Sequence, residues 1–414
     1  MKTIYDIVII GSGASGMMAA VASAAQGAGV LLLEHKEKAA GKLLATGNGK
    51  CNFTNAAMDA SHYYGDRRLF EEVYSTFPLE HTLAFFREIG VYPKCRGGWY
   101  YPASEQAASV AQALECELSR LKADRRFEAE VTRIRTQKDG CFVLELKNEV
   151  LLARRIIFCC GSKASPKSGS DGSAFSLIRG LGHHMTDMQP ALCGFHARGL
   201  PFKKTAGVRL EADLTLFCNE KEVKRERGEL QLTEYGISGI PVFQISSPAS
   251  RSLAAGGNVI VRIDFLPGLG SQELLQELTA RSRHFARETA AWLLNGILPS
   301  RLIPALLSGA GIPFEKKIGK ITAEELLQLI DFLKGVPVTL LSPRGFENAQ
   351  VCTGGLVSSE INAATLESRL VKGIYFAGEI LDVDGECGGY NLQWAWSSGH
   401  LAGCSAAASL HTNR

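Results

Sequence analysis

Hydrophobic and polar positions follow different patterns in successive parts of the chain. A β-branched run at residues 5–10, an alanine-rich segment at 14–26 and a second apolar run at 29–33 predict a strand, a helix and a strand. One short helix between two apolar strands indicates a parallel βαβ unit with a right-handed crossover. We therefore expect the chain to begin with a parallel sheet.

Later segments change this pattern and then return to it. Amphipathic stretches at 69–77, 79–89 and 106–121 predict helices, with the aromatic segment 99–102 as a break, and strand-like runs lie at 126–135, 141–146 and 155–160. Short alternating strands between 190 and 266 indicate an antiparallel barrel or sandwich, and helical stretches follow between 271 and 334. A strand at 373–376 and a helix from 390 resemble the first part again. The simplest plan is one domain split by an inserted second domain.

Composition narrows the class of protein. Hydrophobic residues make up 46% and charged residues 21% of the chain, as in globular proteins and unlike disordered ones. The formal net charge of +3 is too small to indicate a nucleic-acid or anionic-membrane partner. Eleven scattered cysteines favour a reducing compartment, and no apolar run is long enough to span a membrane. We expect a soluble, cytoplasmic protein that acts on a small molecule, and no feature indicates an oligomeric state.

A glycine-rich loop joins the first strand to the first helix. Gly11, Gly13 and Gly16 have the G-x-G-x-x-G spacing, which permits a tight turn, the approach of a pyrophosphate, and packing of helix on strand. The helix N-terminus adds backbone N–H groups and a positive dipole end. Glu34, at the end of the next strand, can accept hydrogen bonds from ribose hydroxyls. This order of elements predicts a dinucleotide site in a Rossmann-like domain.

Two segments near the C-terminus favour FAD over NAD as that dinucleotide. Residues 373–379 place an apolar strand before Gly378 and Glu379, an arrangement by which many flavoproteins reach the ribitol chain. Residues 388–393 open a helix whose N–H groups could face the pyrimidine edge of a flavin, where negative charge gathers on reduction. Gly399 and Gly403, four positions apart on this helix, indicate close packing.

Four segments carry longer motifs: GSGASG at 11–16, GKLLATGNGKCNFTN at 41–55, GISGIPVFQIS at 236–246 and GEILDVDGECGGYNLQWAWSSGHLAG at 378–403. Together they resemble the YhiN/BaiN-like family of FAD-dependent oxidoreductases, which includes bile-acid 4,6-reductase-like and aminoacetone-oxidase-like proteins. The resemblance spans the whole chain and implies an α/β fold. A Rossmann-like FAD-binding domain (1–190 and 341–414) would be split by an antiparallel β-barrel-like substrate domain (191–268) with a small helical module (269–340).

The resemblance also implies which residues hold the cofactor. Ser15, Glu34 and His35 would lie along the ADP half of FAD, with Val131 touching the adenine through its backbone. The residues lining the ribitol chain and the ring would be Lys42, Thr46, Asn52, Gly378, Glu379, Asp384, Asn391 and Gln393. Gly161 opens a glycine-rich segment at 161–182 that looks like one in fumarate-reductase-type flavoproteins.

Three residues are candidates for chemistry at the flavin. Lys50 and Cys51 lie in the loop expected to cross the ring, where Lys50 could stabilise a developing anion and Cys51 could donate a proton. The alternative interpretations are a surface lysine and a small buried thiol. Tyr390 is a further candidate acid. We expect Cys387 to pack rather than react, because the chain has no C-x-x-C pair for a disulfide reductase.

These observations predict an FAD-dependent oxidoreductase that acts on a small organic substrate. The first hypothesis is reduction of an enone or carbonyl compound of the steroid or bile-acid type, with NAD(P)H as transient electron donor. The alternative is an O₂-dependent oxidase of amines or amino-ketones, and a hypothesis of another class is a flavin-bearing RNA-modification or interaction protein. No metal site is expected, because His183 and His184 are adjacent rather than one helical turn apart.

Overall fold

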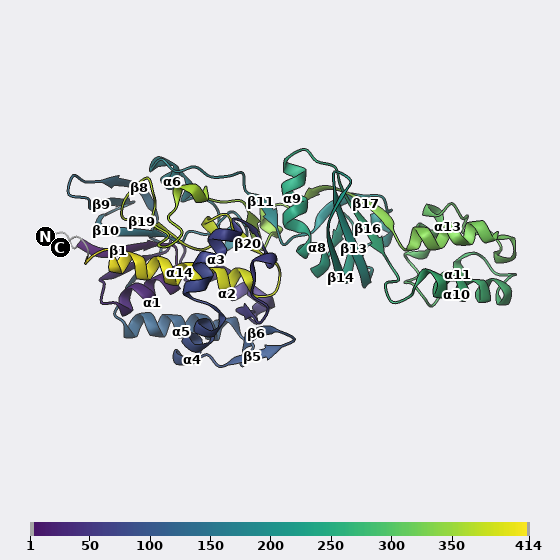
Figure 1. Cartoon of the computed structure of the whole chain (residues 1–414), viewed down its shortest axis with the longest axis horizontal. Coiled ribbons are helices and arrows are strands. Elements are labelled where there is room, and N and C mark those ends of the chain that lie inside the picture. The colour runs from purple at the N-terminus through teal and green to yellow at the C-terminus, as the bar shows by residue number, and fades with distance from the viewer. Residues whose placement is uncertain (1–3, 412–414) are drawn as a thin grey trace. The chain divides into compact units, whose positions relative to one another are not determined.

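The computed structural model describes residues 4–411, which form two compact units (Figure 1). Unit 1 contains both ends of the chain, up to residue 189 and from residue 349 onward, and unit 2 contains residues 190–348. The strand β11 (Gln189–Ala191) includes the change from the first unit to the second. Unit 2 is therefore an insertion within unit 1.

A parallel sheet forms the centre of unit 1. Its parallel strands, in spatial order, are β7 (Asp124–Arg126), β2 (Val30–Leu33), β1 (Ile4–Ile10), β10 (Val150–Phe158) and β19 (Ile374–Phe376). An antiparallel pair, β8 (Val131–Thr136) and β9 (Phe142–Leu146), joins the first half of β10. The last four residues of β1 are all buried, as expected for a strand covered on both faces. Because β19 pairs with β10, the two stretches of unit 1 share one sheet.

Helices cover this sheet. They are α1 (Ala14–Ala25), α2 (Gly41–Ala45), α3 (Arg67–Thr76), α4 (Leu79–Glu88), α5 (Ala107–Arg120), α6 (Phe175–Gly180) and α14 (Tyr390–Ala408). Figure 1 shows α14, in yellow, beside the purple α1. A Cβ on Gly399 would lie 2.5 Å from the carbonyl oxygen of Ser15, and one on Gly403 would lie 2.5 Å from that of Ala19. The expected close packing at these two glycines is confirmed.

Two small sheets complete unit 1. One consists of β3 (Thr54–Asn55), β6 (Trp99–Pro102) and β5 (Pro93–Arg96). The other pairs β4 (Tyr63–Gly65) with β20 (Val383–Gly385). The short strand β18 (Val351–Thr353) belongs to neither of these two sheets. The aromatic segment 99–102, expected as a break between helices, is thus a strand. Gly97 and Gly98 join β5 to β6 with φ of 55° and 89°, as a two-residue hairpin turn requires.

Unit 2 is a closed antiparallel barrel with helices. The barrel strands, in spatial order, are β12 (Phe195–Arg198), β15 (Gly236–Ser238), β14 (Lys221–Thr233), β13 (Arg209–Cys218), β16 (Val259–Asp264) and β17 (Val336–Pro343). The helices are α7 (Phe202–Thr205), α8 (Ile240–Gln244), α9 (Ser246–Ala254), α10 (Ser271–His284), α11 (Ala291–Leu294), α12 (Ile303–Gly309) and α13 (Ala323–Leu333). Since β17 closes the barrel after the last of these helices, the boundary expected at residue 340 falls inside a barrel strand. The expected fold class is confirmed: a Rossmann-like domain is split by an antiparallel barrel that carries a small helical module.

Candidate functional site

The glycine-rich loop lies between the end of β1 and the start of α1. Gly11 has φ of 104°, and a Cβ there would lie 2.4 Å from the carbonyl oxygen of Cys159. A Cβ on Gly16 would lie 1.9 Å from the carbonyl oxygen of Gly11. Close packing within the protein therefore explains why positions 11 and 16 are glycine. A Cβ on Gly13, by contrast, would meet no atom within 4 Å. The open space beside Gly13, at a helix start without a side-chain cap, leaves room and backbone N–H donors for an anion.

Glu34 ends β2 and turns back to this loop. Its Oε2 accepts hydrogen bonds from the backbone N–H of Ser12 at 3.0 Å and from the Ser12 hydroxyl at 2.7 Å. Its Oε1 accepts the backbone N–H of Lys36 at 2.9 Å. The carboxylate is buried, so these bonds offset its loss of hydration and fix it beside the loop.

His35 and the segment before Val131 lie next to Glu34, and Gly161 lies in the glycine-rich segment whose Gly169 faces His35. The Nδ1 of His35 lies 3.2 Å from Glu34 Oε1, and the His35 ring faces Gly169 of the glycine-rich segment 161–182. Gly161 has φ of 70°, and a Cβ there would lie 2.8 Å from the Ser170 hydroxyl. Val131 is buried at the start of β8, two residues after Ala129, whose N–H donates to the carbonyl of Glu34. Of the residues predicted for the ADP half of the cofactor, His35 thus contacts Glu34 and Val131 follows a segment bonded to it, and Ser15 lies against Gly378 and Gly399.

Lys42 and Glu379 meet on the other side of the loop. The backbone N–H of Ala40, just before α2, donates to the carbonyl of Ser12 at 3.0 Å. Lys42 Nζ then lies 2.5 Å from Glu379 Oε2. Gly378, with φ of 79°, lies so close to Ser15 that a Cβ would be 2.4 Å from the serine oxygen. The contacts connect the glycine-rich loop, α2 and the 378–380 turn, which come from both stretches of unit 1.

Three predicted cofactor residues bind protein groups with their side-chain amides. The Asn52 amide donates to the carbonyls of Thr54 and Tyr100 at 3.0 Å each, and the Asn391 amide bonds both backbone groups of Gly385. Gln393 is fully buried; it accepts from the Thr54 hydroxyl, and its nitrogen lies within 3.2 Å of three further protein oxygens. This placement favours a structural role for Gln393 over the predicted contact with the cofactor.

Two more residues predicted to line the ribitol chain and the ring, Thr46 and Asp384, also lie in unit 1. The Thr46 hydroxyl donates to the carbonyl of Leu43 at 2.6 Å, at the end of α2. Asp384 is buried on β20, where its backbone pairs with that of Tyr64.

The predicted catalytic residues differ in their surroundings. Cys51 is fully buried, and burial raises the pKa of its thiol to about 12, against the weaker opposing effect of a hydrogen bond with Thr46. Because the thiol is so weak an acid and is shielded from solvent, it is a poor proton donor at neutral pH, which favours the packing interpretation. The Lys50 side chain is 52% exposed and pairs with Glu105 at 3.5 Å. Tyr390 is buried at the first position of α14, after Gly388 and Gly389 with φ of 128° and 94°.

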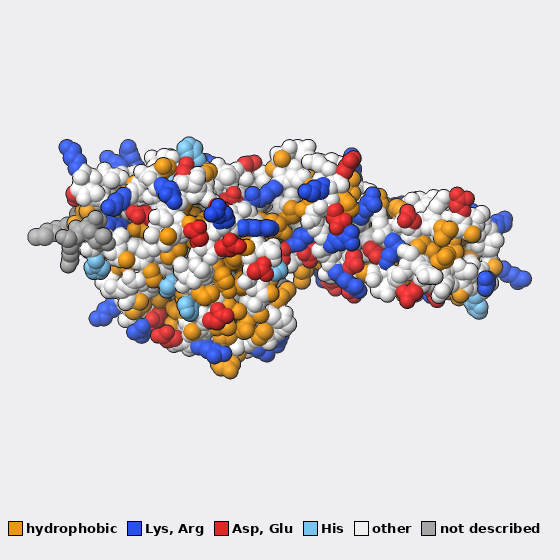
Figure 2. All heavy atoms as spheres, in the orientation of Figure 1, with side chains coloured by type: hydrophobic (Ala, Val, Ile, Leu, Met, Phe, Trp, Pro, Cys, Tyr) orange, Lys and Arg blue, Asp and Glu red, His pale blue; other side chains and the backbone are white. Residues whose placement is uncertain are grey.

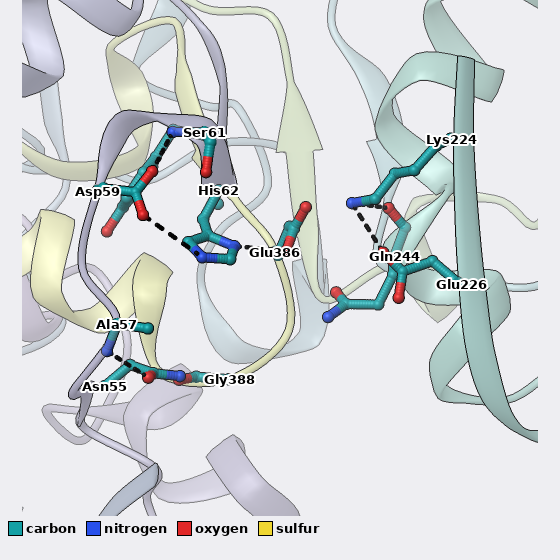
Figure 3. A network of polar contacts seen from close by, with 12 residues as sticks. Asn55, Ala57, Asp59, Ser61, His62, Lys224, Glu226, Gln244, Glu386 and Gly388 are labelled. Carbon is teal, nitrogen blue, oxygen red and sulfur yellow. Dashed lines mark hydrogen bonds and ion pairs between the residues drawn. The ribbon is translucent and has the colours of Figure 1, made fainter. Parts of the chain in front are cut away.

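His62, a histidine that the sequence analysis did not single out, lies between Asp59 and Glu386 (Figure 3) and against Tyr390. The His62 ring stacks on the Tyr390 ring with centroids 4.6 Å apart. Its Nδ1 is 2.9 Å from Glu386 Oε2, and its Nε2 is 3.8 Å from Asp59 Oδ2. Two carboxylates from different parts of the chain thus lie beside one imidazole. The only local sequence signal is the spacing Asp59-x-x-His62, because Glu386 lies 324 positions away.

These features fit a dinucleotide such as FAD. The space beside Gly13 and the uncapped start of α1 suit its diphosphate, and Glu34 suits a ribose. The start of α14 also lacks a side-chain cap hydrogen bond, and the positive end of its dipole suits an electronegative ring edge. Within residues 4–411, no three His, Cys, Asp or Glu side chains are grouped as metal ligands, and no helix is long and apolar enough to cross a membrane.

The fold and the loop define this chain as a dinucleotide-binding enzyme of the flavoprotein type. The family model described as the HI0933-like protein Rossmann domain matches residues 5–405, so the chain belongs to this family. It is 43% identical, over 96% of its length and 98% of the relative's, to the 3-dehydro-bile acid delta(4,6)-reductase of Clostridium scindens. It is 28% identical, over 98% of its length and 99% of the relative's, to the ribosomal RNA dihydrouridine synthase of Haemophilus influenzae.

Solved structures share the fold. A 3-ketosteroid delta1-dehydrogenase from Sterolibacterium denitrificans matches with a TM-score of 0.54 and 12% identity, over 98% of this chain and 100% of the other. A 3-ketosteroid-delta4-(5alpha)-dehydrogenase from Rhodococcus jostii matches with a TM-score of 0.51 and 15% identity, over 98% and 97%. With the family and the relatives, this identifies the chain as an FAD-dependent oxidoreductase, as the sequence predicted.

Proposed function

We propose that this enzyme reduces a carbon–carbon double bond conjugated to a ketone in a steroid-like substrate of the bile-acid type. The observation that carries the proposal is the 43% identity with the bile-acid reductase of Clostridium scindens. The match extends over 402 residues, so it includes both units and the loops of the candidate site. The steroid dehydrogenases support the fold alone.

The chain's own residues would hold and orient the reactants. FAD, when bound, would supply the hydride, and NAD(P)H is the proposed source of its electrons. Gly13, the start of α1 and Glu34 would hold the diphosphate and ribose, with the Lys42–Glu379 pair beside them. The first backbone N–H groups of α14 would stabilise negative charge at the end of the site where Tyr390 lies.

Reduction of such a double bond also takes up a proton. We propose that His62 holds this proton, because its Nδ1 contacts Glu386 (Figure 3) and its ring stacks on Tyr390. The Glu386 carboxylate, itself buried, would fix the orientation of the His62 ring through their contact. Tyr390 is the second candidate for the group that transfers the proton.

A turnover assay tests this function. The FAD-loaded enzyme is mixed anaerobically with a 3-oxo-4,6-diene bile acid and either NADH or NADPH. The proposal expects nicotinamide oxidation in step with a product that has gained two hydrogens for each double bond, detected by mass spectrometry. Peroxide release from amines in air, with no oxidation of NADH or NADPH, would replace this function by the amine-oxidase alternative.

A second candidate is reduction of uridine in ribosomal RNA. Relatives named ribosomal RNA dihydrouridine synthase, from Haemophilus influenzae and Escherichia coli, are each 28% identical over at least 95% of this chain. The double bond of a uracil ring is also conjugated to a carbonyl, so both candidates need the same chemical step. On the face drawn in Figure 2, basic and acidic side chains are interspersed over both units, which offers no uniformly basic surface there.

An RNA assay separates the two candidates. The enzyme is incubated with a ribosomal RNA transcript and NADPH at low and moderate salt, and dihydrouridine is measured by mass spectrometry. Phosphate contacts weaken steeply with salt, so true RNA binding should show that dependence. Dihydrouridine formation without reduction of the steroid would favour the RNA function.

A further inference from the structure

A cluster of charges in unit 1 is not among the residues proposed to hold the diphosphate and ribose of FAD. Glu105 lies among three cations: Lys94 Nζ at 3.2 Å, Lys50 Nζ at 3.5 Å, and the Arg96 guanidinium, which donates to the same carboxylate oxygen as Lys94. We call these four residues the Glu105 cluster. The cation side chains are 45–52% exposed, so solvent and ligands can reach them. With one carboxylate for three cations, the cluster keeps an excess of positive charge.

The cluster borders a small cavity. The cavity measures about 160 Å³ and is lined by Lys50, Arg96, Trp99, Tyr101 and Glu105. Its walls therefore combine two aromatic rings with cationic groups, which suits an organic anion better than an inorganic ion.

The aromatic wall also touches the candidate flavin loops. A Cβ on Gly388, just before α14, would lie 3.5 Å from the Trp99 ring, and one on Gly47 would lie 3.8 Å from the Tyr101 ring. Asn55 reinforces the first contact, since its amide donates to the Gly388 carbonyl at 2.8 Å and its backbone pairs with Trp99. A ligand held in the cavity would thus lie against the loops expected at the flavin.

The local fold sets this geometry. The hairpin β5–β6 pairs Lys94 with Tyr101 and Arg96 with Trp99 across its two strands. Glu105 has φ of 52°, and its backbone N–H donates to the Pro102 carbonyl, which turns the carboxylate back toward the hairpin. The hydrogen bond from Lys94 lowers the pKa of Glu105, so the carboxylate stays charged and competes with any incoming anion.

We propose that Lys50, Lys94 and Arg96 form a binding subsite for the anionic end of a ligand whose other end reaches the flavin loops. The chemistry recognised is a carboxylate or a phosphate on an organic molecule. Its source would be either the carboxylate of an acidic steroid substrate, in which case the subsite rests on the proposed function, or a phosphate of NAD(P)H. The Glu105 carboxylate pairs with the three cations until the anion of the ligand displaces it.

Binding measurements without turnover test this subsite. Isothermal titration calorimetry on the FAD-loaded enzyme uses an acidic 3-oxo-4-ene steroid, its methyl ester, NADPH and NADH as probes. Arg96→Gln should weaken binding of the acid about tenfold and leave the neutral ester unchanged. Glu105→Gln should have the opposite effect and tighten binding of the acid, because it removes the competing carboxylate. A purely structural role would not move the two variants in opposite directions.

The outcomes separate this subsite from the proposed function. If the two variants change NADPH binding in opposite directions but not steroid binding, the anion is the phosphate of the nicotinamide donor. Equal effects of Arg96→Gln on the acid and the ester would overturn the subsite, as would unchanged binding of all four probes. Failure of wild-type enzyme to bind both the acid and NADPH would also overturn it. Failure to reduce a steroid, with binding shifts as expected, would remove only the proposed function.

Discussion

Glu34 accepts hydrogen bonds from Ser12 and Lys36 while it ends the strand that leads to the proposed ribose site. Replacement by alanine would leave the buried N–H of Ser12 without its acceptor and would also remove the ribose contact. We therefore expect Glu34→Ala to weaken FAD binding by about tenfold or more. The ratio of flavin to protein absorbance after dialysis measures this effect.

A matched control lies at the other end of β1. Asp6 accepts the backbone N–H of Gly29 at 2.9 Å, which is the same type of bond away from the glycine-rich loop. Asp6→Ala should therefore keep its flavin through dialysis. If both variants retain equal flavin, Glu34 does not hold the ribose.

His62 provides a second test at the scale of single residues. Glutamine in its place would keep a polar group near Glu386 but could not carry the proton. We expect His62→Gln to lower kcat about 100-fold, with flavin content unchanged, and to remove one limb of the pH–rate profile. Steady-state kinetics over a range of pH values measure both effects.

His184→Gln is the matched control for this substitution. His184 pairs with Glu360 at 2.6 Å, as His62 pairs with Glu386, but its side chain is 79% exposed and lies away from Tyr390. Its variant should have wild-type kinetics. A wild-type pH profile for His62→Gln would exclude His62 as the source of the proton.

At the scale of residues, sequence spacing predicts proximity only where the residues are close in the chain. The three loop glycines and Glu34 lie within one βαβ unit, so their spacing alone placed them together. The contact between His62 and Glu386 joins positions 324 apart, and no local pattern could have indicated it. Gln393 lies beside the expected motif, but its burial against Thr54 and Thr82 depends on how α14 packs.

The contact between α1 and α14 carries the main prediction at the scale of elements. A Cβ on Gly403 would lie 2.5 Å from the carbonyl oxygen of Ala19, so a larger residue must push the helices apart. We expect Gly403→Val to lower the free energy of unfolding by about 1–3 kcal/mol. Because α1 begins at the glycine-rich loop, its displacement should also weaken flavin retention. Urea unfolding and the dialysis assay measure the two effects.

Gly180→Val is the control for this helix contact. Gly180 ends α6, and a Cβ there would meet no atom within 4 Å. The change should alter stability only slightly and leave flavin retention unchanged. Equal destabilisation by the two valine variants would show that helix propensity, rather than helix packing, explains the loss.

Elements were predictable where the hydrophobic period is strong and local. The first βαβ unit, the helices between residues 67 and 120, and α14 follow directly from such periods. Several strands were not predicted, β6 and β17 among them, because pairing partners distant in sequence define them. β6 is a strand because it pairs with β3 and β5, and β17 belongs to the barrel because it pairs with β12 and β16.

At the scale of the whole molecule, the absence of a nucleic-acid partner stays a prediction from net charge alone. The charge of +3 led us to expect no nucleic-acid partner, yet relatives covering nearly the whole chain are named ribosomal RNA dihydrouridine synthase. A sum over 414 residues hides local excesses such as the three cations around Glu105. The assembly of unit 1 from both ends of the chain was predicted correctly. The glycine-rich loop near the N-terminus and the segments 373–379 and 388–393 near the C-terminus were expected to serve one FAD site.

Buried histidines make the stability of unit 1 depend on pH. Burial lowers the pKa of His183, which bonds the Ser368 hydroxyl, and of His400, which stacks on Phe77, below the ordinary value of 6.5. Well above pH 6.5 both histidines are neutral in the folded and unfolded states, so their titration does not change the free energy of unfolding. As pH falls below 6.5, the unfolded chain takes up protons that the folded chain resists, and stability is lost. The carboxylates titrate only at lower pH, so the range from about pH 7 to about pH 5.5 isolates the histidines.

The Tm of the enzyme should therefore fall between about pH 7.5 and about pH 5.5. His400→Phe removes one titrating group but keeps a ring against Phe77, so its Tm should fall less over the same range. His284→Phe, at an exposed position of α10, should keep the wild-type dependence. Calorimetric scans at several pH values measure all three proteins. If the fall in Tm is the same in His400→Phe as in the wild type, burial of this ring does not oppose its protonation, and the pH dependence must come from other groups.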